Sequence, residues 1–318
     1  SFKVTMCMLR GVEGSDRCMQ TLVVAFNGYR ITTPNLIVHL QQPTFGPMFR
    51  TLLTWLLIPV AGTAFAGGEH LPTSARFAGM GHAGITLVDL WSTSGNQAGL
   101  AGLEQAVGGA FFQQHWLAPD LAMQGLAFAL PTKQGTFALS ASSFGNSLYA
   151  QRSFGLAYAM KLNEGLRASV QLDYLNIRLG NDYGSTGAVT AELGVQARLT
   201  DHLWMGAHLY NPNRAKLGGP YAEHVPTVLA VGLSYQFNEQ VILAGEVSKD
   251  IDRPEQYHAG VEYRPIKALF LRTGISSGPA KAHFGAGLRM GQLDLDLAAV
   301  VRSQLGLTPM VNLNYRFK

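Results

Sequence analysis

The final stretch of the chain, residues 309–318, alternates strictly between apolar and polar side chains. The apolar positions are Val311, Leu313, Tyr315 and Phe317, and the polar positions between them are Asn312, Asn314 and Arg316. A period of two residues is typical of a β-strand with one apolar and one polar face. The same pattern fills most of the chain from residue 106 onward, without a helical period between. The sequence therefore predicts an all-β protein.

Segments with this alternation number about fourteen between residues 106 and 318, and turn residues separate them. The phase is clearest in 165–174, 189–199 and 293–297, where apolar side chains hold every second position. Most segments are close to the ~9–11 residues that cross a bilayer at a tilt, and an even strand number suits a closed bacterial barrel. A soluble β-sandwich shows the same alternation, so the pattern alone leaves both architectures open.

Composition separates these alternatives. Charged residues make up 14% of the chain, against about 25% in ordinary soluble domains. The mean hydropathy is only +0.10, and beyond residue 66 no apolar run reaches the ~18 residues that a transmembrane helix needs. Strands with alternating faces give this combination of low charge and modest hydropathy. The sequence therefore predicts a transmembrane antiparallel β-barrel of about fourteen strands over residues 106–318.

The N-terminal region has the pattern of a secretory signal peptide at residues 48–66. A short basic start at Met48 to Arg50 precedes an apolar core, and Ala64-Phe65-Ala66 forms an A-x-A cleavage site. We interpret residues 1–47, which hold both cysteines, as an over-extended start that is not structural; a cytoplasmic leader is the alternative. The mature chain would begin at Gly67, without cysteine, and would reach the cell outer membrane through a Sec-type signal.

Trimming residues 1–66 removes most of the net positive charge. That region carries five basic and two acidic residues, so 19 of the 24 basic and 18 of the 20 acidic residues remain. A nearly neutral chain gives no indication of nucleic-acid binding. The histidines show no metal-ligand spacing, and nothing in the sequence places a nucleophile beside a base. We therefore expect no metal, no cofactor, no catalytic residue and no enzymatic activity.

Residues 67–105 lack strand alternation and are rich in glycine and alanine. They form either an irregular lead-in or a plug inside the barrel. The patterns Ala75-Arg76-x-x-Gly79-Met80-Gly81-x-Ala83 and Asn96-Gln97-Ala98-Gly99-Leu100 lie within them. These patterns resemble the N-terminal segment of the FadL-like long-chain fatty-acid transporter superfamily, nearest to its PorV/PorQ subgroup of type IX secretion barrels. That family commonly has Asn-Pro-Ala where this chain has Gln97 in the middle position.

The resemblance implies a barrel of fourteen strands with the N-terminal segment folded into the lumen as a plug. The residues it implies for the plug or gate are Arg76, Gly79, Gly81, Asn96, Gly99 and Leu100. The last strand resembles the C-terminal assembly signal of outer-membrane barrels, carried here by Val311, Leu313, Tyr315 and Phe317. This implies that the barrel-assembly machinery and outer-membrane lipid are partners of the chain.

If the apolar faces contact lipid, the alternate positions line the lumen. The charged residues at those positions are Arg167, Asp173, Glu192, Glu246, Glu262, Arg272, Arg289, Asp294, Asp296 and Arg316. Because both signs are present, they form either a salt-bridged filling or the lining of a polar pathway. Aromatic residues near strand ends are expected to form interfacial girdles; they are Trp116, Trp204, Tyr210, Tyr235, Tyr257, Tyr263 and Tyr315.

The connections alternate in length, with tight turns at 163–164, 238–239 and 291 and longer polar loops at 180–186, 211–225 and 249–253. We expect the long loops on the extracellular side. Two functions remain open. The first is a PorV/PorQ-like component that docks a secretion-system or surface-protein partner, which the compact mature chain and short loops favour. The second is a FadL-like conduit that takes up a hydrophobic ligand. A small porin is a minor third possibility.

Overall fold

The computed structural model describes residues 23–26, 29–32, 74–180, 184–218 and 224–318. The chain forms two compact units, residues 1–64 and 65–318. In the first unit, β1 (Val23–Phe26) and β2 (Tyr29–Thr32) pair antiparallel. The predicted signal peptide and residues 67–73 lie outside the described residues, so the interpretation of the N-terminus stays a prediction.

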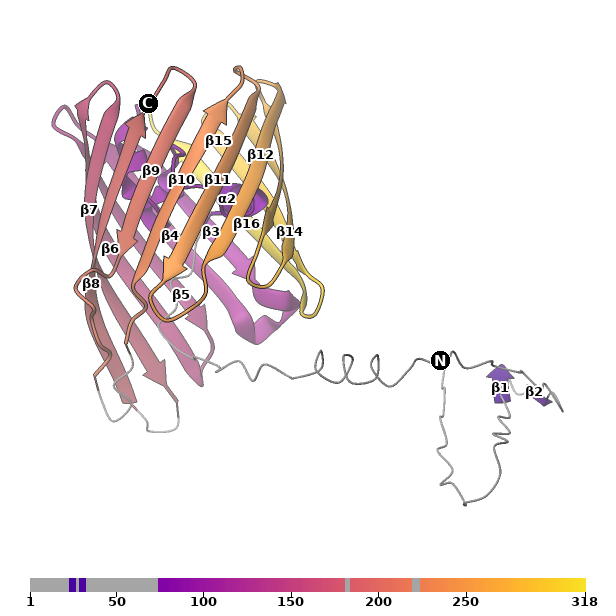
Figure 1. Ribbon diagram of the computed structural model, residues 1–318. Helices are drawn as coiled ribbons and strands as arrows, with labels where there is room; N and C mark the ends of the chain where they lie inside the picture. The colour runs from indigo at the N-terminus through magenta and orange to yellow at the C-terminus, as the bar shows by residue number, and fades with distance from the viewer. Residues whose placement is uncertain (1–22, 27–28, 33–73, 181–183, 219–223) are drawn as a thin grey trace, which may run out of the picture. The chain divides into compact units, whose positions relative to one another are not determined.

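The second unit contains a closed antiparallel β-barrel of fourteen strands, β3 to β16, which confirms the predicted fold class (Figure 1). The strands are β3 (Val107–Gln114), β4 (Ala122–Pro131), β5 (Thr136–Gly145), β6 (Tyr149–Asn163), β7 (Leu166–Leu179), β8 (Gly184–Arg198), β9 (Leu203–Tyr210), β10 (Val228–Gln236), β11 (Val241–Asp250), β12 (Gln256–Ile266), β13 (Leu269–Ser276), β14 (Lys281–Met290), β15 (Leu293–Arg302) and β16 (Gly306–Arg316). The alternating C-terminal stretch closes the barrel, because β16 pairs with β3 from Arg316 opposite Val107 to Met310 opposite Gln113. No barrel edge is left unpaired.

The alternation of side chains follows the two faces of the wall. On β7, Leu172 is 53% exposed on the outside and Asp173 is 6% exposed on the inside. Every barrel strand carries at least one large apolar side chain on its outer face. An apolar surface of this extent marks contact with lipid or with another protein.

The connections sort onto two rims as their lengths predict. The tight turns 164–165, 237–240 and 291–292 lie on the rim where the chain ends. The longer connections, including 211–227 and 251–255, lie on the opposite rim, which we call the long-loop rim.

The aromatic prediction is partly wrong. Tyr235, Tyr257, Tyr263, Tyr315 and Trp116 are exposed. Trp204 and Tyr210 instead share the inward face of β9 with the buried His208. In the pairing of β9 with β10, Trp204 lies opposite the inward-facing Ser234, so Trp204 also faces inward. Because side chains alternate along a strand, Tyr210, six residues further on, faces the same way.

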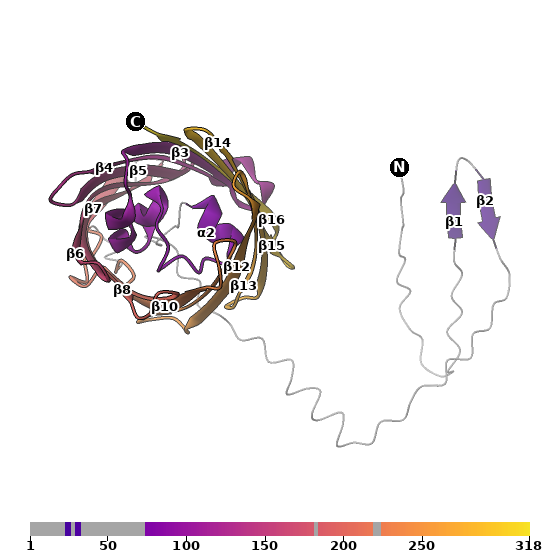
Figure 2. The same ribbon diagram turned by 90° about the horizontal axis from the view of Figure 1, so that it is seen from above.

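Residues 74–105 lie inside the ring of strands, as seen along the barrel in Figure 2. We call them the luminal segment. It contains α2 (Ala75–Gly79) and two 3-10 helices, η1 (Leu90–Ser94) and η2 (Gln97–Gly102). Each begins at a polar residue that accepts a backbone N–H: Ser74 from Phe77, Asp89 from Trp91, and Asn96 from Ala98. Among the residues described, no helix is long and apolar enough to cross a membrane.

Apolar side chains of the luminal segment pack directly on small residues of the wall. Leu90, Trp91 and Leu100 form a buried cluster with Phe111 and Met123 and with alanines of β4 to β6. Phe77, Met80, Ala83 and Leu87 pack on Ala244 of β11. Small inward residues therefore leave room for the segment, and the segment supplies the apolar contacts that a narrow barrel would otherwise lack.

Candidate functional site

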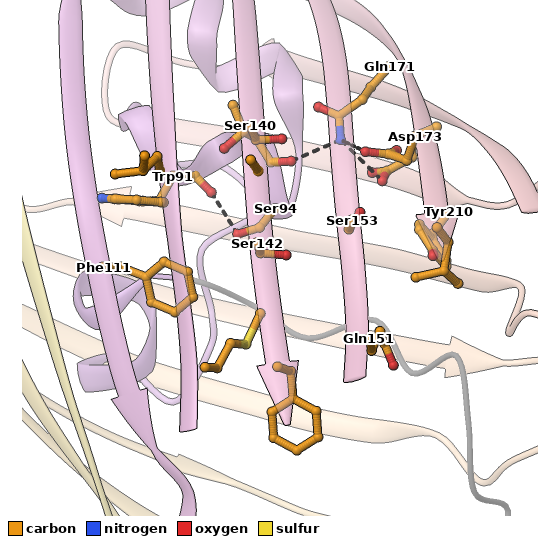
Figure 3. A pocket seen from close by; sticks show the side chains of 17 residues that line it. Trp91, Ser94, Phe111, Ser140, Ser142, Gln151, Ser153, Gln171, Asp173 and Tyr210 are labelled. Carbon is orange, nitrogen blue, oxygen red and sulfur yellow. Dashed lines mark hydrogen bonds between the residues drawn. The ribbon is translucent and has the colours of Figure 1, made fainter. Parts of the chain in front are cut away.

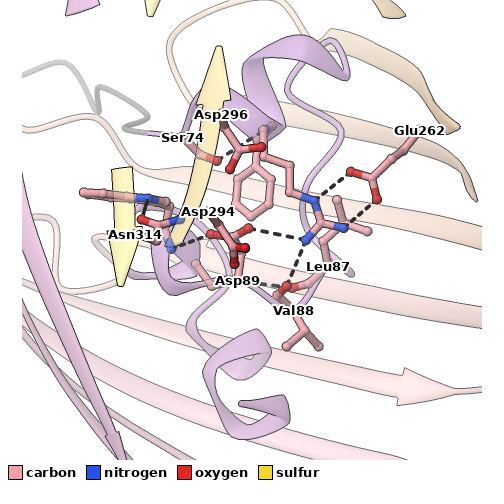
Figure 4. A network of polar contacts seen from close by, with 12 residues as sticks. Ser74, Leu87, Val88, Asp89, Glu262, Asp294, Asp296 and Asn314 are labelled. Carbon is pink, nitrogen blue, oxygen red and sulfur yellow. Dashed lines mark hydrogen bonds and ion pairs between the residues drawn. The ribbon is translucent and has the colours of Figure 1, made fainter. Parts of the chain in front are cut away.

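Arg76 fixes the luminal segment to the wall through a bidentate ion pair with Glu262 of β12. Its Nε lies 2.9 Å from Glu262 Oε2 and its Nη2 lies 2.8 Å from Oε1. Arg272 of β13 donates to the same carboxylate at 2.7 Å and to Asp296 of β15 at 2.5 Å. Arg76 also donates to Asp89 within the segment at 3.3 Å (Figure 4). These buried charges are paired and hydrogen-bonded, as burial requires.

A second set of contacts holds the segment at Ile85. Glu246 of β11 accepts the backbone N–H of Ile85 at 3.1 Å. The Asn96 amide donates to the carbonyls of Ile85 and Val195, each at 2.9 Å, and Gln196 donates to the Ile85 carbonyl at 3.0 Å. Asn96 therefore joins one end of the luminal segment to its middle and to strand β8.

The predicted gate glycines lie at close contacts, Gly79 and Gly81 against the wall backbone and Gly99 against other residues of the luminal segment. A Cβ on Gly79 would lie 3.0 Å from Gly285 Cα, and one on Gly81 would lie 2.6 Å from two carbonyl oxygens of β12 and β13. Gly81 also has φ +70°, a conformation that favours glycine. A Cβ on Gly99 would lie 2.6 Å from Ser92 Oγ, and Leu100 is fully buried. All six predicted gate residues therefore lie in the luminal segment at close contacts.

Three histidines surround the turn after α2. The ring centroid of His82 lies 5.3 Å from that of His283 and 6.4 Å from that of His258. Burial lowers the pKa of the His82 imidazole well below its ordinary value, and the nearby His283, His258 and Lys281 act in the same direction. In the described parts of the chain, no group of three or more His, Cys, Asp or Glu is arranged to hold a metal ion.

One serine lies beside a histidine, which sequence reasoning did not anticipate. Gly274 to Gly278 matches the pattern G-x-S-x-G, and Ser276 Oγ lies 2.8 Å from His283 Nε2. That pattern serves hydrolases in a turn between a strand and a helix, whereas here it ends strand β13. Both side chains are buried, and His283 Nδ1 lies 2.7 Å from the Ala78 carbonyl oxygen. The pair therefore positions the luminal segment.

The ten predicted luminal charges separate into distinct groups. Arg289, Asp294 and Arg316 do not join the internal network. Asp294 lies 3.1 Å from Arg289 Nε and 3.2 Å from Arg316 Nε, close to the Gly291 turn, and these side chains are partly exposed. Alternation gives the side of the wall on which a charge lies but not its position along the strand, so it could not separate these three charges from the buried ones. Arg167 lies inside, over the ring of Trp204 at 4.4 Å.

Asp173 and Glu192 belong to a separate, amide-rich cluster. Gln171 Nε2 donates to Asp173 at 2.8 Å, to Glu192 at 3.3 Å and to the carbonyl of Thr93 at 3.0 Å. Glu192 also accepts from Gln97 at 2.6 Å and lies 2.8 Å from His208 Nε2. The middle position of the Asn-Gln-Ala pattern thus contacts the wall directly.

This cluster forms one side of a luminal cavity of about 60 Å³ (Figure 3). Trp91, Phe111, Met123 and Phe144 provide its apolar side. The polar side is formed by Ser140, Ser142, Gln151, Ser153, Gln171, Asp173, Glu192 and Tyr210, among others. Many of these residues lie near the strand ends at the long-loop rim. The cavity therefore lies between the luminal segment and that rim.

An apolar groove of about 570 Å³ lies on the outer face of the same wall and is lined by residues of β4 to β8. It shares Leu126, Ser140, Ala141 and Asp173 with the luminal cavity. Gly155 lies between them: a Cβ there would come within 2.5 Å of both Asp173 Oδ1 and Ser140 Oγ. The cavity and the groove are thus back to back across a wall of small residues.

Sequence reasoning found Asp173 and Glu192 but missed most of the cavity. Gln171 could have been found, because it shares the polar face of β7 with Asp173. Phe111 adjoins Phe112 and gives no alternation, and Trp91 lies in the irregular segment. Tyr210, expected in an interfacial girdle, is buried on the inner face at the end of β9. These aromatic positions depend on tertiary packing that periodicity does not encode.

No family model and no curated protein matches the chain in sequence. Solved structures match in fold. The CymD monoaromatic hydrocarbon channel aligns with a TM-score of 0.60 and 13% identity over 79% of this chain and 99% of that one. The toluene transporter TbuX of Ralstonia pickettii gives 0.57 and 14% over 79% and 100%. A FadL homologue of Pseudomonas aeruginosa gives 0.55 and 12% over 79% and 100%.

The chain is thus similar in fold to FadL-like outer-membrane channels. At these identities the likeness is one of fold alone. The predicted resemblance to the FadL-like superfamily is supported at that level, and the assignment to the PorV/PorQ subgroup stays a prediction.

Proposed function

We propose that this chain is an outer-membrane conduit for small hydrophobic molecules. The membrane location is supported by the large apolar side chains that all fourteen strands present outward. An outer surface of this kind is poorly suited to water and well suited to lipid. The similar structures named above are described as channels and transporters, which favours this function over docking of a secretion partner.

One observation carries the proposal: the luminal cavity and the outer groove adjoin across Ser140, Ala141 and Gly155. A molecule that enters from the long-loop rim reaches the cavity, and the luminal segment blocks the straight path onward. The groove offers an apolar destination in the lipid phase. Strand pairing is continuous from β4 to β7, so passage requires a local opening of this wall.

The test is uptake of labelled toluene by Gram-negative cells that lack their own hydrocarbon channel. Expression of the chain should raise the initial uptake rate several-fold. Ser153→Phe fills the cavity and should return the rate to that of cells without the protein. Leu233→Phe, on the outer face of β10 and away from both cavities, should match the unchanged protein at equal surface amount. Undiminished uptake by Ser153→Phe contradicts the proposal.

A further variant separates lateral from axial passage. Leu156 lies on the outer face of β6 and lines the groove. Leu156→Trp fills the groove without entering the lumen, so it should slow uptake only when molecules leave through the wall. Uptake blocked by Ser153→Phe and unaffected by Leu156→Trp would place the exit along the barrel axis instead.

The docking hypothesis stays a prediction. It expects a partner to bind the long loop 211–225, whose residues 219–223 lie outside the described residues. Replacing this loop would abolish partner binding and leave toluene uptake unchanged.

A further inference from the structure

We infer that the luminal cavity selects small amphiphiles whose head donates hydrogen bonds, an amine or a hydroxyl on an apolar body, and that it rejects carboxylates. This inference rests on the proposed conduit function, since it names what the same cavity accepts. Three features of the cavity support the inference: its acidic lining, a buried acceptor without a partner, and its aromatic lining.

The polar side of the cavity is acidic. Asp173 and Glu192 both line it, and none of the lining residues is lysine or arginine. The imidazole beside Glu192 belongs to His208, which does not line the cavity. Serine hydroxyls of the wall can donate, but an anionic head placed here would face two carboxylates at short range in a poorly solvated site. A cationic head is attracted by these carboxylates, and a neutral donor can form hydrogen bonds to them.

Gln171, one of the lining residues, carries a buried acceptor without a partner. Its Nε2 is directed to three oxygens, those of Thr93, Asp173 and Glu192, which fixes the orientation of the amide. Its Oε1 then has no hydrogen-bond partner among the described residues, although the side chain is only 2% exposed. A buried acceptor without a donor is destabilising. A ligand head that donates to this oxygen removes that penalty.

The apolar side provides a place for the body of the ligand. Trp91 and Phe111 meet edge to face with ring centroids 5.4 Å apart, and the indole is held by a 2.9 Å bond from its Nε1 to Asn314. The volume of about 60 Å³ corresponds to about two waters at liquid density. It therefore accepts the head group, and a ring must displace the half-buried Phe144 at the end of β5.

Four probes of nearly equal size isolate the head group: benzylamine, benzyl alcohol, toluene and benzoate. Displacement of Phe144 is common to all four and cancels in the comparison. Calorimetric titration of the full protein in detergent at pH 7 should show benzylamine and benzyl alcohol binding at least tenfold more tightly than toluene. Benzoate should show no saturable binding. Equal affinity for toluene and benzyl alcohol, or saturable binding of benzoate, overturns the inference.

Asp173→Asn tests the charge with little change in shape. It should weaken benzylamine about tenfold and benzyl alcohol less than threefold, because a bond between charged partners is about twice as strong as a neutral one. Asp294→Asn, an acidic residue outside the cavity, is the matched control and should change neither. An unchanged affinity of Asp173→Asn for benzylamine contradicts the proposed head site. The wild-type series stands without this variant if the variant does not fold.

Failure of the inference and failure of the conduit give different results. Toluene uptake that Ser153→Phe abolishes, without any advantage for the donor heads, refutes the inference and leaves the conduit intact. Absence of both uptake and binding for all four probes refutes both.

Discussion

Removing the carboxylate of Glu262 should release the first half of the luminal segment from the wall. Glu262 accepts three hydrogen bonds, two from Arg76 and one from Arg272. In Glu262→Ala, Arg272 keeps Asp296, and Arg76 keeps Asp89 and the Val88 carbonyl. The wall and the segment then lose their bidentate connection, and the guanidinium groups of Arg76 and Arg272 each lose an acceptor.

The magnitude follows from the burial of this network. Removing one partner of a buried, hydrogen-bonded ion pair typically costs about 3–5 kcal/mol. The lower end applies here because each arginine keeps one carboxylate. Because the fourteen strands pair with one another and not with the segment, the cost should appear as local opening. About 3 kcal/mol corresponds to roughly a 150-fold rise in the open population.

Hydrogen exchange measures this opening directly. The amides of Ala78, His82 and Ala83 are hydrogen-bonded within the segment and should exchange roughly 150-fold faster in Glu262→Ala. Strand amides should keep their protection. Glu239→Ala is the matched control, because the Glu239 side chain is 92% exposed and lies 3.8 Å from Arg264; such pairs stabilise little. Exchange at Ala78 and His82 within threefold of the unchanged protein would refute the reasoning.

Three further substitutions test other contacts of the account. Gly260→Ala places a Cβ against the Met80 backbone and should displace the luminal segment, seen as new protease cleavage within residues 74–89 with the barrel intact; an unchanged digest contradicts this packing. Asn96→Ala removes two hydrogen bonds to backbone carbonyls and should speed amide exchange in η2 at least tenfold; unchanged exchange there contradicts a rigid connection. Phe317→Ala should slow the appearance of the heat-modifiable folded form in pulse-labelled cells, because the Phe317 ring packs on Phe128 beside the closing strand. Normal assembly kinetics would show that Phe317 is not part of an assembly signal.

The wall was predictable because its two environments repeat every second residue. On β8 the outward Val189, Leu193 and Val195 alternate with the buried Glu192 and Gln196, and that contrast fixes both the strand and its phase. Boundaries were less predictable. The alternation that is clear from residue 189 onward belongs to a strand that starts at Gly184, because β8 extends past the apolar belt into polar residues where alternation ends.

Alternation predicted which side chains face the interior of the barrel but not which of them form pairs. Alternation placed Glu262 and Arg272 inside, yet Arg76 lies 186 residues from Glu262 in sequence, and nothing local pairs them. The position of a residue along the barrel axis cannot be read from alternation either. Asp294 near a turn and Asp296 in the buried network therefore look alike in the sequence. The gate residues depended on resemblance, and the structure supplies the close backbone contacts around Gly79 and Gly81.

The central claim is that a filled lumen excludes ions while small molecules pass through its cavity. Conductance of the purified protein in planar bilayers tests the filled lumen most directly. The account predicts no steady ohmic conductance for the unchanged protein, and brief openings for Glu262→Ala, in which the luminal segment loses its bidentate connection to the wall. A large, steady conductance of the unchanged protein would contradict the account, because it would require a continuous water-filled path past residues 74–105.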